Sequence, residues 1–139
     1  MRPMRRSVIL VLAAAAPAIA LAASPPSALT EVAAGMWEIS GVPGAQSPVR
    51  QCIGDILALA QFEHRGQTCS RKVLSDSGRS TLINYSCGSA GFGQSQIDVI
   101  TPRSLRISTQ GISDQLPFNY VLQARRVGDC TKSASFTRH

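Results

Sequence analysis

The stretch that decides the fold is residues 69–87, which read CSRKVLSDSGRSTLINYSC. Two runs that contain β-branched and aromatic side chains lie on either side of a polar segment with Gly78 near its middle. Such a pattern predicts an antiparallel β-hairpin with its turn at the glycine. A turn centred on Gly78 places Val73 opposite Ile83, and the other residues of the two strands pair in the same register.

The same register indicates how the four cysteines of the chain pair. It places Cys69 opposite Cys87, and directly opposed residues have Cα atoms about 4.5–5.5 Å apart, within the range that a disulfide bridges. By elimination, Cys52 pairs with Cys130 and ties an early strand to the end of the last one. The sequence contains no C-x-x-C pair, which disfavours a zinc site and a redox-active dithiol. We therefore expect two structural disulfides and no metal.

The first 23 residues have the order of a secretory signal peptide. They consist of a basic start at 1–6, an apolar run at 7–22 and small residues before Ser24. An uncleaved anchor and a buried helix are the alternatives, but the run is shorter than the roughly 18 residues of a spanning helix, and Pro17 interrupts it. The short alanine-rich signal is typical of bacteria. We predict cleavage, a periplasmic location that suits disulfides, and no transmembrane segment afterwards.

Removal of this segment changes the composition. Three of the 14 basic residues and none of the 8 acidic residues belong to it, so the net charge falls from +6 to +3. About 116 residues remain, which is a common size for one domain and too few for a separate cofactor domain. The basic residues form no run. We expect no nucleic-acid partner, and at most a weak association with anionic polymers or lipids of the envelope.

Outside the hairpin, further short segments show the alternation or the β-branched composition of strands. They lie at 35–40, 49–53, 96–101, 105–109 and 118–127. One short helix is predicted, with Asp55 as its cap and Gly66 just beyond its end. The predicted fold is all-β: an antiparallel meander of about seven strands, curled into an open sheet or a small barrel, with one short helix and two disulfides. This domain spans 35–130, between a flexible leader at 24–34 and a disordered tail at 131–139.

The order of these features resembles one family of small exported proteobacterial proteins of unknown function, domain-of-unknown-function family thirty-six seventeen. The matching features are the G-x-W-E motif at 35–38, Cys52, the two hairpin cysteines, the glycine-rich 87–93 and the R-V-G-D-C motif at 126–130. The resemblance covers about residues 35–130 and implies an exported, disulfide-bonded β domain. It implies no activity and no catalytic residue. The methionine- and glycine-rich segment that often follows the tryptophan in the family is reduced here to 41–48, so a role tied to that segment does not carry over.

The tryptophan also resembles a second family. Lipocalin-type barrels begin with G-x-W on the first strand and carry an arginine on the last strand that packs over the indole. Trp37 with Arg125 or Arg126 would supply that pair. This resemblance implies a carrier of a small apolar ligand, which needs an internal cavity of about 300 Å³ or more. The simpler interpretation places Trp37 in the core and leaves both arginines as solvated charges.

Catalytic chemistry has little support in the sequence. Nucleophilic catalysis needs a base beside a serine or cysteine, and the chain has only two histidines, His64 and His139. His64 lies at the predicted helix end, where the helix dipole would stabilise it. The acidic residues form no close pair of the kind that glycosidases use. We expect no catalytic, cofactor-binding or metal-binding residue, and a non-enzymatic binding or envelope-associated domain. The alternative is a hydrolase whose site assembles near His64 from a serine or an aspartate distant in sequence.

Overall fold

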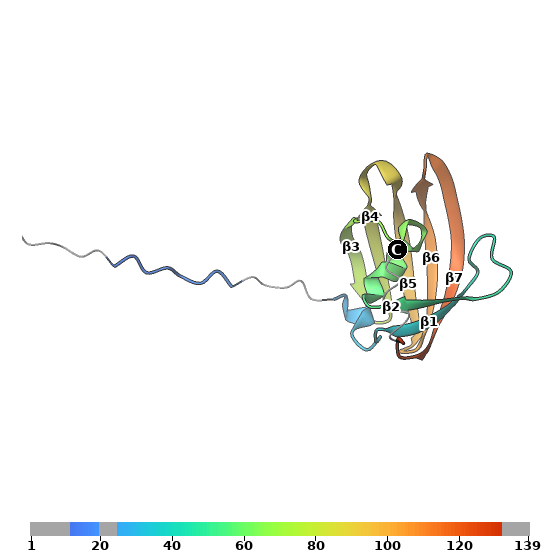
Figure 1. Ribbon diagram of the computed structural model, residues 1–139, viewed down its shortest axis with the longest axis horizontal. Coiled ribbons are helices and arrows are strands. Elements are labelled where there is room, and N and C mark those ends of the chain that lie inside the picture. The colour runs from blue at the N-terminus through green and yellow to red at the C-terminus, as the bar shows by residue number, and fades with distance from the viewer. Residues whose placement is uncertain (1–11, 20–24, 132–139) are drawn as a thin grey trace, which may run out of the picture.

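The structure is a computed structural model that describes residues 12–19 and 25–131 (Figure 1). Most of the predicted signal peptide at 1–23 lies outside these residues, as does the predicted tail apart from Thr131. Both therefore stay predictions. Residues 12–19 have no regular secondary structure and are exposed. No helix in the described ranges is long and apolar enough to cross a membrane.

Seven antiparallel strands form one sheet in the order β2-β1-β7-β6-β5-β4-β3. The strands are β1 (Gly35–Ser40), β2 (Val49–Ile53), β3 (Ser70–Ser77), β4 (Ser80–Ser86), β5 (Gly91–Thr101), β6 (Ser104–Ser113) and β7 (Leu116–Gly128). The chain runs as a meander from β3 to β7, and β1 pairs with the edge of β7 that lies away from β6. The edge strands β2 and β3 each pair with one neighbour and not with each other, so the sheet does not close into a barrel. The predicted curled sheet is therefore confirmed in its open form.

The predicted hairpin at 69–87 is confirmed, and its predicted register holds from Ser70 to Val73, whereas nearer the turn Ser75 pairs with Leu82 and Ser77 with Ser80, one residue away from the prediction. Val73 lies opposite Ile83, and the pairing shifts by one residue at Leu74 before the turn. The shift is a β-bulge, which bends an edge strand and opposes pairing with another chain. The disulfides Cys69–Cys87 and Cys52–Cys130 are also confirmed, with Cα atoms 4.2 Å and 5.4 Å apart.

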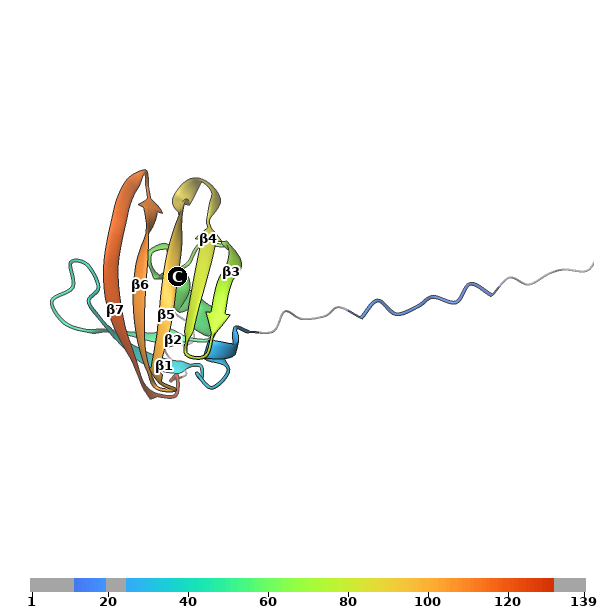
Figure 2. The ribbon, with the colours of Figure 1, turned by 180° about the vertical axis from the view of Figure 1, so that it is seen from behind.

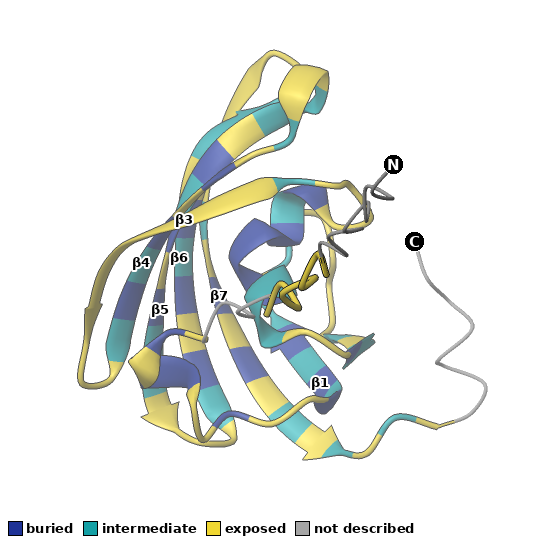
Figure 3. Ribbon diagram, turned by 90° about the vertical axis from the view of Figure 1, so that its left-hand side faces the viewer, coloured by how far each residue is buried: buried dark blue, intermediate teal, exposed yellow. Residues whose placement is uncertain are grey.

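The concave side of the sheet is filled by η2 (Ile56–His64), a 3-10 helix around which the strands curl (Figure 3). The Asp55 carboxylate caps its first turn by accepting a hydrogen bond from the Leu57 amide, as the sequence predicts. Leu59, Ala60 and Phe62 are buried against the sheet. The core includes Trp37, Ile39, Ile83, Ile97, Leu105, Ile107 and Leu122. Each such aliphatic side chain contributes about 1.5–3 kcal/mol by its burial.

A buried polar pair fastens η2 to the middle of the sheet. The hydroxyls of Ser95 on β5 and Thr109 on β6 lie opposite each other and 2.7 Å apart. The Ser95 hydroxyl also donates to the Ala60 carbonyl on η2. Both side chains are buried, so these bonds satisfy polar groups that would otherwise oppose the packing of the helix.

The segment before β1 differs from the flexible leader that the sequence predicts. Residues 25–34 include the single turn η1 (Ser27–Leu29), and Leu29 and Val32 belong to the core. The Asp76 carboxylate on β3 accepts hydrogen bonds from two backbone amides of η1 at 2.6 Å and 3.1 Å. These contacts join the segment to the edge strand, and this long-range pairing has no local sequence signal.

Candidate ligand-binding groove

A row of polar side chains crosses five strands of the sheet on the side opposite η2. In strand order the row is Lys72, Asn84, Gln94, Gln110 and Asn119, each opposite the next in the register. We call the four carboxamides the amide row. Their sequence neighbours Ile83, Ser95 and Thr109 are buried on the inner face. Because side chains alternate along a strand, the amide row faces outward, on the side of the sheet nearer the viewer in Figure 2.

The side chains of the amide row are only partly engaged with one another. The Gln94 amide nitrogen donates to the Asn84 side-chain oxygen at 2.9 Å, which orients both groups. No hydrogen bond within the described chain engages the side chains of Gln110 and Asn119, and both residues are exposed. The row therefore presents several donors and acceptors to solvent.

An apolar row lies beside the amide row on the same face of the sheet, two residues away along each strand. Phe92 on β5 lies opposite Ile112 on β6, which in turn lies opposite Pro117 on β7. The Phe92 side chain is large and 55% exposed. An aromatic ring in that position offers apolar contact area to a ligand that also reaches the amides.

The polar row together with Phe92 and Ile112 lines a groove of about 1030 Å³ that is open along one side. Five short stretches form its surface: 70–72, 84–86, 92–94, 110–112 and 118–119. Arg71 and Lys72 are the charged residues of this lining, and neither a carboxylate nor an imidazole belongs to it. A second hollow of about 180 Å³ shares three of the amides and extends the depression along the sheet.

Two glycines form the floor of the groove between these rows. Gly93 and Gly111 lie opposite each other, and on the inner face the rings of Tyr85 and Phe118 lie against them. A Cβ atom on Gly93 would lie 2.5 Å from the Tyr85 hydroxyl, and one on Gly111 would lie 3.0 Å from a Phe118 ring carbon. Aromatic side chains that cover glycines in this way stabilise the sheet where it lacks side chains of its own.

His64 lies behind this floor, on the inner side. Its ring is 4% exposed and makes edge contacts with Tyr85 and Phe118, with centroids 5.4 Å and 5.9 Å apart. Nε2 lies 3.1 Å from the Ala90 carbonyl oxygen, which only accepts, so Nε2 carries a proton and donates it. Nδ1 lies within hydrogen-bond distance of the Tyr85 hydroxyl, at 3.1 Å. These partners are a phenol and a backbone carbonyl of η3 (Gly88–Ala90), rather than the serine or aspartate that the hydrolase hypothesis requires.

The phenols of the buried Tyr85 and the partly buried Tyr120 are donors rather than bases. Burial raises the pKa of Tyr85 to about 12, and the Glu63 charge adds to the increase, while a hydrogen bond with Thr109 opposes it. Burial also raises the pKa of Tyr120, whose hydroxyl donates to the Glu63 carboxylate at 2.7 Å. Both hydroxyls therefore stay protonated at neutral pH, Tyr85 behind Gly93 of the groove floor and Tyr120 bonded to Glu63 on η2.

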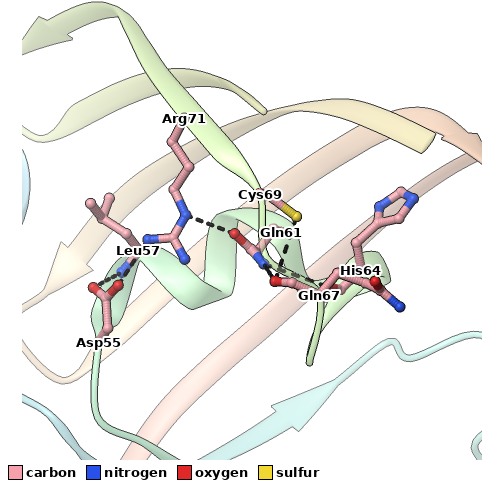
Figure 4. A network of polar contacts seen from close by, with 7 residues as sticks. All are labelled: Asp55, Leu57, Gln61, His64, Gln67, Cys69 and Arg71. Carbon is pink, nitrogen blue, oxygen red and sulfur yellow. Dashed lines mark hydrogen bonds and ion pairs between the residues drawn. The ribbon is translucent and has the colours of Figure 1, made fainter. Parts of the chain in front are cut away.

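A polar network fixes the β3 side of the groove to η2 (Figure 4). Arg71 donates to the Gln61 side-chain oxygen at 2.7 Å and pairs with Asp55 at 2.8 Å. Gln61 in turn donates to the Gln67 carbonyl at 3.0 Å. Because Asp55 compensates the charge of Arg71, Lys72 is the groove residue whose charge has no ion-pair partner in the described chain.

The residues singled out from sequence lie away from the groove. Trp37 is fully buried in the core, and its indole nitrogen donates to the Ala33 carbonyl at 3.3 Å. Arg125 pairs with Glu38 at 3.4 Å. Arg126 donates to the Ala34 carbonyl at 2.9 Å and pairs with Asp129 at 2.6 Å. The register does place Arg126 opposite Trp37 on β1, but the concave side that a lipocalin-type carrier would use is occupied by η2.

Sequence reasoning missed the groove residues. Their alternation with apolar residues marks them as outward-facing, but the alignment of four carboxamides depends on the register of three strand pairs. No group of three or more histidines, cysteines or acids in the described ranges could hold a metal ion.

No protein-family model matches this chain, and no curated protein or solved structure matches it. The similarity of residues 35–130 to domain-of-unknown-function family thirty-six seventeen therefore stays a prediction from motifs.

Proposed function

We propose that the chain is an exported, non-enzymatic binding domain of the periplasm, and that its ligand lies in the groove on the outer face of β3 to β7. The observation that carries the proposal is the amide row beside Phe92 in a groove of about 1030 Å³. Carboxamides aligned over four strands offer directed hydrogen bonds, and the exposed ring offers apolar area. A few placed polar groups beside apolar surface are typical of ligand sites.

The chemistry of the groove supports binding rather than catalysis. Carboxylates and imidazoles serve most often as general bases, and the lining residues include neither. The one histidine of the described core, His64, uses both ring nitrogens to hold Tyr85 and the Ala90 carbonyl. The two disulfides are compatible with an oxidising location outside the cytoplasm, and the predicted signal peptide suggests the periplasm.

Native mass spectrometry of the protein purified from the periplasm of its own host tests the proposal. We expect a bound adduct on the wild-type protein, and loss of that adduct when Gln94→Ala and Gln110→Ala are combined. Gln123→Ala is the matched control, because Gln123 is an exposed carboxamide of β7 outside the groove lining. If the adduct is retained equally by all three proteins, or the wild-type protein carries none, the groove is not the ligand site.

A further inference from the structure

The hydrogen-bonding groups of the groove match a ligand that is rich in hydroxyl groups. Each carboxamide presents an acceptor oxygen beside a two-proton donor, and a hydroxyl group both donates and accepts. Gln94 and Asn84 are held ready by their mutual bond of 2.9 Å, and the next two amides of the row are free of partners within the described chain. A purely apolar ligand would strip water from these amides without replacing its hydrogen bonds, which opposes binding.

The apolar row adds a second requirement, since the ligand must also present apolar area. Phe92, 55% exposed, lies next to Ile112, and both stand directly beside the amide row. The ring of a pyranose sugar has this combination: its hydroxyls project from the edge and its C–H groups form apolar faces. One sugar unit can therefore bond an amide and lie against the Phe92 ring.

The shape of the groove favours a chain of sugars over a single one. From Lys72 to Asn119 the polar side chains cross five strands, and spacings of 4.7–4.9 Å between neighbouring strands make this line roughly 19 Å long. The second hollow of about 180 Å³ widens the depression along the strands, from Gln94 and Gln110 toward Gln96 and Ser108. A short oligosaccharide fills this length, and the open side of the groove leaves room for the chain to continue.

The charge of the groove indicates the sign of the ligand. Arg71 is compensated by Asp55 at 2.8 Å, while Lys72 at the β3 end of the row has no ion pair in the described chain. The groove lining holds no acidic residue that would repel an anion. We infer that the ligand is an acidic oligosaccharide, a chain of sugars that carries carboxylates, with its hydroxyls on the amide row, a sugar face on Phe92 and a carboxylate at Lys72. This inference rests on the proposed function and specifies its ligand class.

Isothermal titration calorimetry with three defined probes tests the inference on the mature, oxidised chain. The probes are tetragalacturonate, the neutral tetrasaccharide cellotetraose and the peptide tetraglutamate. We expect tetragalacturonate to bind about 3-fold more tightly than cellotetraose, the size of one exposed ion pair, and tetraglutamate not to bind. Equal binding of tetraglutamate and tetragalacturonate, or no binding of either sugar, would overturn the inference.

Matched variants separate the contributions of the Lys72 charge and the Phe92 ring to sugar binding. Lys72→Met should remove the 3-fold preference for tetragalacturonate over cellotetraose. Phe92→Ala should weaken both sugars about 5-fold, as expected for loss of one aromatic contact. Gln123→Ala, the exposed carboxamide outside the groove, should change neither. All three side chains are exposed, and an unchanged melting temperature would show that folding is intact.

The two proposals fail in different ways. If the adduct from the periplasm depends on Gln94 and Gln110 but is not a saccharide by mass, the groove is a ligand site and only the sugar inference is wrong. If saccharide binding survives the combined substitution of both glutamines, the site lies elsewhere and both proposals are wrong.

Discussion

The packing of Tyr85 against Gly93 gives a sharp prediction about the floor of the groove. The backbone of Gly93 lies outside the left-handed region, so alanine at this position causes no backbone strain. Its Cβ atom, however, would lie 2.5 Å from the Tyr85 hydroxyl oxygen and 2.6 Å from the carbon that bears it. Carbon atoms in van der Waals contact stand about 3.5–4.0 Å apart, so the Tyr85 ring has to move by about 1 Å.

The cost of that movement follows from the surroundings of the ring. Tyr85 is 3% exposed, and its hydroxyl bonds Nδ1 of His64 at 3.1 Å. Overpacking of a well-packed core costs about 1–3 kcal/mol, and loss of the hydrogen bond adds about 1 kcal/mol. We therefore expect Gly93→Ala to lower the free energy of unfolding by about 2–4 kcal/mol. In a Tyr85→Val background the clash is absent, and the same substitution should stabilise the strand by about 0.5 kcal/mol.

Urea unfolding of the four proteins, with both disulfides intact, measures the coupling between the two positions. The account predicts a coupling free energy of about 3 kcal/mol in this double-mutant cycle. Val121→Ala on the exposed face of β7 is the control, and it should show no coupling to Gly93→Ala. If Gly93→Ala is neutral in the wild-type background, or equally costly in both, Tyr85 does not cover this glycine as described.

Three further predictions concern other parts of the fold. Two backbone hydrogen bonds lower the pKa of Asp76 below its usual 3.8, so its stabilising effect is present above pH 3.8 and is lost as the pH falls through the lowered value. As the pH is lowered, the melting temperature of the wild-type protein should therefore fall more steeply than that of Asp76→Asn. Parallel plots of melting temperature against pH for the two proteins would contradict this. Asp114 and Gln115 both have positive φ in the β6–β7 turn, at 48° and 67°, a conformation that asparagine and glycine adopt more readily. The double variant Asp114→Asn, Gln115→Gly should therefore raise the free energy of unfolding by about 1 kcal/mol, and an unchanged urea midpoint would contradict this. Replacement of both Cys52 and Cys130 by alanine should lower the free energy of unfolding by about 4 kcal/mol in the same assay, because their bridge closes a loop with a sequence separation of 78. A loss under about 1 kcal/mol would show that the bridge does little to restrict the unfolded chain.

The parts of the fold that could be predicted from sequence depend on local patterns. The glycine at position 78 between two β-prone runs predicts the hairpin and the Cys69–Cys87 pairing. The turn itself lies between Ser77 and Ser80, and the bulge at Leu74, which the sequence did not predict, restores the pairing of Val73 with Ile83. Asp55 before an apolar run likewise marks the start of η2. In each case the deciding residues lie close together in the chain.

The groove could not be predicted because it depends on long-range alignment. The sequence shows that Gln94 and Gln110 face away from the core, but the bulges at Leu74 and near Ile100 shift two of the strand pairings. The role of His64 was hidden for a similar reason. Its partners Tyr85 and Ala90 lie 21 and 26 residues away, and only the curl of the sheet around η2 brings them to the ring.

The side-chain amide spectrum of the protein shows whether the groove holds a ligand. The ¹⁵N-labelled chain would be isolated from the periplasm, and its spectrum compared before and after unfolding in urea, dialysis and refolding with both disulfides intact. The account predicts that removal of the ligand shifts the NH₂ resonances of the amide row and leaves those of Gln123 in place. Unchanged resonances of the amide row, or equal shifts at Gln123, would contradict it.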